Sequence, residues 1–243
     1  MHLATTCRTP TRTVLALLTL SLLALSLLLA ACSDTNDASD TSDEPALPTD
    51  SSPAPTLAAT STASPEPAAD HRRPAPNSTW QWQLLGDLNT SYDVDIYDID
   101  LFDSPIELIS QLHSDRRRVV CYFSAGSFED WREDAPAFQP DDIGNQLDGW
   151  EGERWLDVRS PAVQAIMLTR LNLARDKGCD GVEPDNVDGY DNDTGFPLTA
   201  EDQLTFNRFL ADQAHARGLA IALKNDGAQL PDLLSHYDFA LNE

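Results

Sequence analysis

Short apolar runs alternate with amphipathic stretches over residues 77–243. Six of the runs are typical of β-strands in length and composition: 80–84, 94–99, 118–123, 181–183, 219–223 and 238–242. Helical patterns cover 106–112, the stretch 161–177 that ends before Gly178, and the stretch that follows the N-cap residue Thr199.

Strands that alternate with helices predict parallel βα units, and these close most simply as a (β/α)8 barrel. We therefore expect an α/β, TIM-barrel-like fold. A complete barrel of this kind has eight strands, so the six predicted strands indicate a barrel truncated after about the sixth strand and incomplete on its C-terminal side.

The first 31 residues have the form of a signal peptide. Arg8 and Arg12 precede a nearly unbroken apolar run over 14–31, and small residues stand directly before Cys32. This exit resembles a bacterial lipobox, which implies lipidation of Cys32. The alternative is a transmembrane helix, because the run is about long enough to span a bilayer; no charged cluster that would stop transfer follows it. We expect an extracytoplasmic protein, lipid-anchored to a bacterial membrane at the cell surface or in the periplasm.

Residues 32–76 are predicted to be a disordered linker. The segment is rich in Ser, Thr, Pro and Asp and contains no aromatic residue, so it cannot bury enough apolar surface to offset its ordering entropy. The first aromatic residue after it is Trp80, which places the folded domain at 77–243.

The chain is strongly acidic, with 40 Asp and Glu against 16 Lys and Arg and a formal net charge of −24. Such a field disfavours nucleic acid as a partner and favours a cationic ligand. Plain solubility or adaptation to salt is an equally good explanation of the charge. Cys121 and Cys179 are the cysteines left in the domain, and an extracytoplasmic location favours a disulfide between them.

The five histidines have no paired metal-ligand spacing, and the Asp-rich run 185–193 lacks the ligand order of an EF-hand loop. The sequence therefore predicts neither a metal nor another cofactor.

Acids and amides gather where the predicted strands end, which is where TIM barrels keep their chemistry. The stretch 181–190 alone contains Glu183, Asp185 and Asp188, more acids than a core strand needs. Cleavage of a glycosidic bond requires two positioned carboxylates, and Glu243 is a candidate for the second.

Five motifs, in order, resemble those of glycoside hydrolase family 114: VCYFSAGS (120–127), WLDVR (155–159), DGVEPDN (180–186), LKND (223–226) and NE (242–243). Members of that family include endo-α-1,4-polygalactosaminidases. The resemblance implies a TIM-barrel hydrolase of α-1,4 bonds in a galactosamine-containing, cationic polysaccharide, with a retaining mechanism. Asp185 is the expected nucleophile and Glu243 the expected acid/base.

Further residues at the strand ends are expected to bind substrate or support the site: Asp98, Tyr122, Glu183, Asn186, Lys224, Asn225 and Asp226. For Glu183, a structural ion pair with Lys224 is an equally good account. Trp131 and Trp150 are candidate sugar platforms, whereas core or lid packing is preferred for Trp155. The alternative function is a non-catalytic carbohydrate-binding surface lipoprotein, or an inactive fragment of such a hydrolase.

Overall fold

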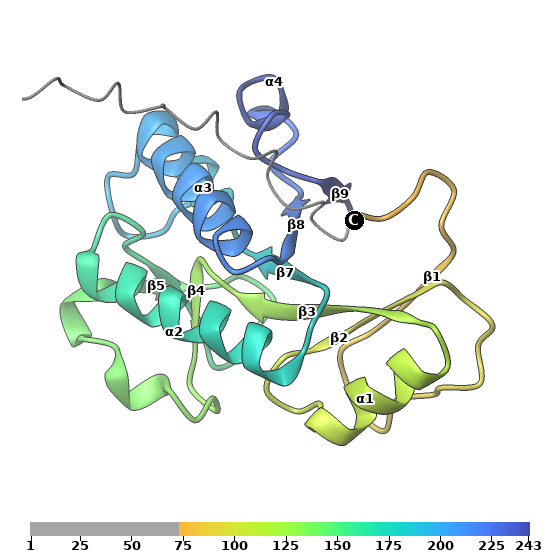
Figure 1. Cartoon of the computed structure of the whole chain (residues 1–243). Helices are drawn as coiled ribbons and strands as arrows, with labels where there is room; N and C mark the ends of the chain where they lie inside the picture. The colour runs from red at the N-terminus through yellow and green to blue at the C-terminus, as the bar shows by residue number, and fades with distance from the viewer. Residues whose placement is uncertain (1–72) are drawn as a thin grey trace, which may run out of the picture. The chain divides into compact units, whose positions relative to one another are not determined.

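The computed structural model describes residues 73–243 (Figure 1). The predicted signal peptide, the lipidation of Cys32 and the linker up to residue 72 lie outside these residues. Within the described range, no helix is both long enough and apolar enough to cross a bilayer. Arg73, which the sequence assigned to the linker, pairs with the buried Asp238 at 3.0 Å, so contacts with the domain begin before residue 77.

Six parallel strands form the main sheet (Figure 1). Their order in the sheet follows the chain: β1 (Trp80–Gln83), β2 (Ile96–Asp100), β3 (Arg118–Ser124), β7 (Gly181–Asp185), β8 (Ala220–Lys224) and β9 (Phe239–Leu241). The predicted α/β, TIM-barrel-like fold is confirmed as a half-barrel, since the described residues form six parallel strands and a complete barrel has eight.

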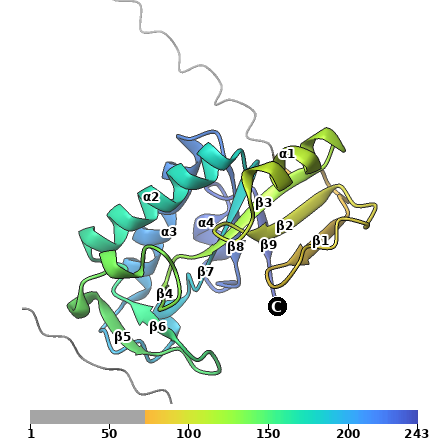
Figure 2. The same cartoon turned by 90° about the horizontal axis from the view of Figure 1, so that it is seen from below.

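Helices cover one face of this sheet (Figures 1 and 2). They are α1 (Ile106–Ser114), α2 (Pro161–Lys177), α3 (Ala200–His215) and α4 (Leu230–Leu233). Helix α2 begins where the Ser160 hydroxyl accepts a hydrogen bond from the backbone N–H of Ala162, and it ends at Gly178 with a φ of 88°. Thr199 and Asp202 form a capping box at the start of α3.

A second, antiparallel sheet lies beyond the carboxyl end of β3, between β3 and α2 in the chain (Figure 2). Its strands have the order β4 (Ser127–Glu129), β6 (Glu153–Leu156), β5 (Ile143–Gln146). This sheet was not predicted from the sequence, because strands of three or four residues are too short to show alternation. Short 3-10 turns also occur at η1 (Ala135–Ala137), η2 (Pro140–Asp142) and η3 (Gly189–Asp191).

The two faces of the main sheet differ in polarity, because successive side chains on a strand point to opposite sides. On β3, Val119, Cys121 and Phe123 pack into the core beneath the helices, whereas Tyr122 and Ser124 point to the other, inner face. The β3–β7 register aligns Tyr122 with Glu183 and Ser124 with Asp185. Polar side chains of neighbouring strands therefore meet on the inner face.

Cys121 of β3 and Cys179, just before β7, form a disulfide. Both residues are buried in the core under the helices. The bond joins two adjacent strands whose cysteines lie 58 residues apart in the chain, so it closes the part of the molecule that contains the small sheet and α2.

Candidate active site

Lys224, the last residue of β8, lies at the centre of the inner-face cluster. Its side chain is 1% exposed, and its Nζ is 3.0 Å from Glu183 Oε1 and 3.3 Å from Asp185 Oδ2. Burial alone would lower the pKa of Lys224, but Asp185 and Glu183 outweigh it and raise that pKa. Lys224 is therefore held as a buried cation between carboxylates from β7.

Asp185 ends β7 and is fixed by two further donors. The Tyr122 hydroxyl donates to Asp185 Oδ2 at 3.2 Å, and the backbone N–H of Asn186 donates to Oδ1 at 2.8 Å. The two hydrogen bonds fix the orientation of the carboxylate. The Asp185 side chain remains 19% exposed, so its oxygens are both oriented by the protein and open to a ligand.

The turn that follows Asp185 depends on a close backbone approach. Asn186 has a φ of 59°, a left-handed conformation that Asn tolerates better than most residues. Its side-chain amide donates to the Ser124 hydroxyl at 2.9 Å and to the Ser127 hydroxyl at 3.2 Å. A Cβ on Gly126 would lie 1.7 Å from the Asn186 backbone oxygen. Only glycine fits there, which accounts for the small residues of the AGS turn.

Glu243 reaches the same cation from the segment after β9. Its Oε1 lies 3.8 Å from Lys224 Nζ, and its side chain is 53% exposed. Its backbone N–H donates to the Asn225 side-chain oxygen at 3.1 Å, so Asn225 positions the residue. Because Lys224 Nζ is 3.3 Å from Asp185 Oδ2 and 3.8 Å from Glu243 Oε1, these two oxygens are separated by no more than about 7 Å.

Asp98 and Glu183 form a buried carboxylate pair on the inner face. They are 1% and 0% exposed. Burial, followed by the charge of Glu183, raises the pKa of Asp98 well above its usual range. Burial also raises the pKa of Glu183, against the opposing effect of Lys224. A proton held by Asp98 thus allows Glu183 to remain close by as the partner of Lys224.

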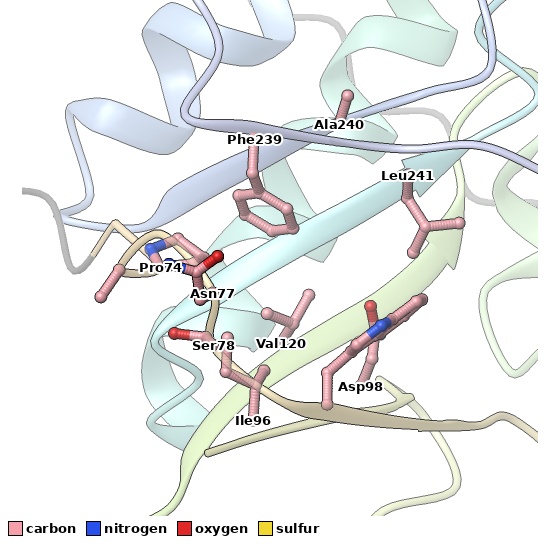
Figure 3. A pocket seen from close by; sticks show the side chains of 11 residues that line it. Pro74, Asn77, Ser78, Ile96, Asp98, Val120, Phe239, Ala240 and Leu241 are labelled. Atoms are coloured by element: carbon pink, nitrogen blue, oxygen red, sulfur yellow. The ribbon is translucent and has the colours of Figure 1, made fainter. Parts of the chain in front are cut away.

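Glu183 forms the ion pair with Lys224 that was one of the two roles expected for it. A substrate contact of Asp98 or Glu183 stays a prediction. Figure 3 shows Asp98 with Phe239 and Leu241 around a hollow on the inner face, between β1, β2 and β9. Lys224 is likewise buried, and acts through the carboxylates that it holds.

Asp226 also has internal partners where a sugar contact was expected. It is 5% exposed, and it accepts from the Tyr190 hydroxyl at 3.3 Å and from the Asn207 amide at 3.0 Å. Burial raises its pKa to about 6. Asp226 thus anchors helix α3 to the loop after β8. Its substrate-binding role stays a prediction.

Two hollows flank Asp185. One, of about 400 Å³, lies on the side of Tyr122 and is rimmed by Trp82, Trp131 and Trp150. The other, of about 190 Å³, is lined by Asp185, Asn186, Lys224 and Asn225, among others, and Trp150 borders both. Trp131 and Trp150 are exposed, as a platform requires, whereas Trp155 is 6% exposed and packed.

Several residues of the first hollow were not identified from the sequence, among them Glu129, Arg132 and Glu153. Arg132 binds both oxygens of Asp100, at 3.0 and 2.7 Å, and Oε1 of Glu129 at 2.8 Å. No local pattern marks these acids, because β4 and β6 are only three and four residues long and residues 153–156 do not alternate. No group of His, Cys, Asp and Glu among residues 73–243 is arranged to hold a metal ion.

The model of glycoside-hydrolase family GH114 matches residues 60–243 of the chain. A crystal structure of Aspergillus fumigatus Ega3 in complex with galactosamine is similar at 51% sequence identity and a TM-score of 0.69, over 70% of this chain and 68% of that one. The glycoside hydrolase domain of PelA from Pseudomonas aeruginosa is similar at 18% identity and a TM-score of 0.54, over 68% and 66%, a likeness that shows the fold alone. No curated protein matches the chain.

Proposed function

Because the chain belongs to glycoside hydrolase family GH114, we propose that it hydrolyses α-1,4 glycosidic bonds in a galactosamine-containing polysaccharide. The observation that carries the proposal is that Asp185 and Glu243 both approach one buried cation, Lys224, at 3.3 and 3.8 Å. The substrate class is supported by the galactosamine bound in the similar Ega3 structure and by the net charge of −24, which favours a polymer carrying protonated amines.

The geometry supports a retaining, two-carboxylate reaction. Carboxylates of retaining enzymes lie roughly 5–5.5 Å apart, a separation that the ceiling of about 7 Å between Asp185 Oδ2 and Glu243 Oε1 allows. Asp185 receives hydrogen bonds from Tyr122 and Asn186 and contacts Lys224. These three contacts fix the orientation of the Asp185 carboxylate, which suits a nucleophile.

Glu243 is the more exposed acid and suits the acid/base role. In the first step its proton passes to the leaving glycosidic oxygen while Asp185 bonds to the anomeric carbon. In the second step Glu243 takes a proton from water, the water oxygen attacks the anomeric carbon, and the bond to Asp185 breaks. Asn225 has a positioning role, because its side-chain oxygen accepts a hydrogen bond from the backbone N–H of Glu243.

Release of reducing ends from partly deacetylated polygalactosamine tests this function. Asp185→Asn and Glu243→Gln should each lower kcat by more than about a hundredfold, whereas Glu201→Gln, at an exposed acid on α3, should leave it unchanged. Proton NMR during the first turnovers should show the α-anomer as the initial product. A wild-type chain that is folded yet releases no reducing ends would overturn the proposal.

We also propose that the protein is a membrane-anchored lipoprotein, outside the cytoplasm. Support comes from the basic start, the apolar run and the small residues before Cys32. Cells expressing the chain with an alkyne-labelled fatty acid should attach label to the wild type and none to Cys32→Ser. Equal labelling of the two proteins would refute the assignment of Cys32.

A further inference from the structure

The hollow beside Tyr122 combines an acidic floor with an aromatic rim. Its volume is about 400 Å³. Glu129 and Glu153 belong to the floor, and they come from the antiparallel strands β4 and β6. Trp82, Trp131 and Trp150 belong to the rim. The Tyr122 hydroxyl, which donates to Asp185, connects this hollow to the proposed nucleophile.

The two floor acids are placed where they cost stability. Glu129 and Glu153 stand directly opposite each other in the β4–β6 register, and like charges in that position repel. They are 2% and 5% exposed, and burial raises the pKa of each. Arg132 pairs with Glu129 at 2.8 Å, whereas Glu153 has no ion pair among the described residues, so the second acid is not explained by packing or by ion pairing.

One carboxylate oxygen in the floor of the hollow, Glu129 Oε2, accepts no hydrogen bond among the described residues. Arg132 donates to Glu129 Oε1, but the Arg170 guanidinium approaches Glu129 Oε2 only to 3.8 Å. Glu153 Oε2 accepts from the Ser127 hydroxyl at 2.7 Å. The hollow's charged lining consists of four acids, Asp100, Asp103, Glu129 and Glu153, against the single cation Arg132, so a cationic donor is the missing partner.

The rim supplies flat apolar surface for a ring. Trp131 and Trp150 are 52% and 60% exposed, and Trp82 is 37% exposed. Exposed indole rings of this kind stack on the apolar face of a sugar and attract a nearby cation. Gly152, with a φ of 89°, leaves room for the Trp131 ring, because a Cβ there would lie 2.9 Å from it.

We infer that this hollow is a subsite for one protonated hexosamine, whose ammonium group binds Glu129 and Glu153 while its ring stacks on the tryptophans of the rim. The inference rests on the proposed function for the polymer as a whole, and adds the residues that select an amino sugar over a neutral one. It predicts that the amine is recognised directly beside the reacting bond.

Indole N–H signals in 1H–15N NMR of the full chain test the subsite, because all five tryptophans of the sequence lie in the described residues. Titration with D-galactosamine should move the signals of Trp82, Trp131 and Trp150. It should leave that of Trp80, which borders the separate hollow of Figure 3, in place. D-Galactose at the same concentrations should bind at least about tenfold more weakly.

Substitutions then separate charge from stacking. Glu153→Gln keeps the acceptor for Ser127 and should raise the galactosamine Kd by about tenfold or more; Trp131→Ala should do so by a similar factor. Glu151→Gln, at an exposed acid in the same turn, is the matched control and should bind like the wild type. If Glu153→Gln does not fold, as judged by circular dichroism, Trp131→Ala still decides the outcome.

Equal affinity for galactose and galactosamine, or unchanged galactosamine affinity in both variants, would overturn the inference. The outcome is distinguishable from that for the proposed function through Asp185→Asn, which should bind galactosamine normally and hydrolyse nothing. A wild type that hydrolyses the polymer but binds both sugars alike would leave the hydrolase intact and remove the subsite. Selective galactosamine binding without hydrolysis of the polymer would support the subsite and overturn the proposed hydrolase function.

Discussion

Substitution of Lys224 by Met tests whether one buried cation holds the inner-face carboxylates together. Lys224 Nζ contacts Glu183 at 3.0 Å, Asp185 at 3.3 Å and Glu243 at 3.8 Å. Methionine has a similar length and no charge. The substitution therefore removes the ammonium group while keeping most of the apolar contact along the side chain.

The expected loss of stability comes mainly from Glu183. That residue and Lys224 are 0% and 1% exposed in their side chains, and removal of one partner from a buried ion pair costs about 3–5 kcal/mol. Glu243 is 53% exposed, so its share is below about 1 kcal/mol. We expect Lys224→Met to lower the free energy of unfolding by about 3–5 kcal/mol at pH 7.

The pH dependence of this loss has a definite sign. Without Lys224, the pKa of Glu183, already raised by burial, rises further. A carboxyl whose pKa is higher in the folded state than in the unfolded state stabilises the fold at low pH and loses that contribution as the pH rises. The deficit of Lys224→Met should therefore shrink as the pH falls from 7 towards 4.

Urea unfolding followed by tryptophan fluorescence measures these differences. The double variant Lys224→Met/Glu183→Gln should recover most of the lost stability, because it no longer buries an unpaired charge. Arg175→Met is the control: its pair with Asp176 is 49% and 62% exposed and should contribute less than about 0.5 kcal/mol. A loss below about 1 kcal/mol for Lys224→Met, or a double variant no more stable than the single, would refute the reasoning.

Three further predictions concern other parts of the domain. Asp226→Asn should raise the unfolding free energy at pH 7 by up to about 3 kcal/mol, since the pKa of Asp226 is raised to about 6. In urea titrations the wild type should lose stability as the pH rises from 4 to 6, whereas the variant should not. Replacing Cys121 and Cys179 together by Ala should cost about 4 kcal/mol by calorimetry, because the disulfide closes 58 residues of chain. Gly126→Ala should cost about 3 kcal/mol and abolish polymer hydrolysis, since its Cβ would displace the Asn186 carbonyl.

The sequence predicted the ends of α2 and the start of α3 best, because these are marked by local chemistry, whereas the short α4 was not predicted. Helix α2 has the predicted bounds, between the Ser160 cap and Gly178, and α3 begins directly after Thr199 as expected. Strand β7 was predicted two residues too short, since Pro184 argues against a strand interior. Its parallel neighbours β3 and β8 place Asp185 at the end of the strand nonetheless.

The candidate site was predicted in part. The features that were missed depend on contacts between residues that are distant in sequence. Strand ends and the family resemblance pointed to Asp185, Lys224 and Tyr122, which do lie together. Neither source showed that Asp98 and Asp226 are buried, because burial depends on strands and helices that are distant in sequence. The pairing of Glu129 with Glu153 was missed for the same reason, since it arises only when β4 and β6 meet.

The carboxylates around Lys224 divide into two kinds according to depth. Asp98 and Glu183 are buried and share their environment with the cation, and burial favours a proton on Asp98. Asp185 and Glu243 are 19% and 53% exposed at the same cation. Because the buried pair holds Lys224 from within, the ammonium group keeps a fixed position without being covered by the outer pair. The outer carboxylates are thereby oriented by the protein and still free to meet a sugar, which is the combination that a two-carboxylate reaction requires.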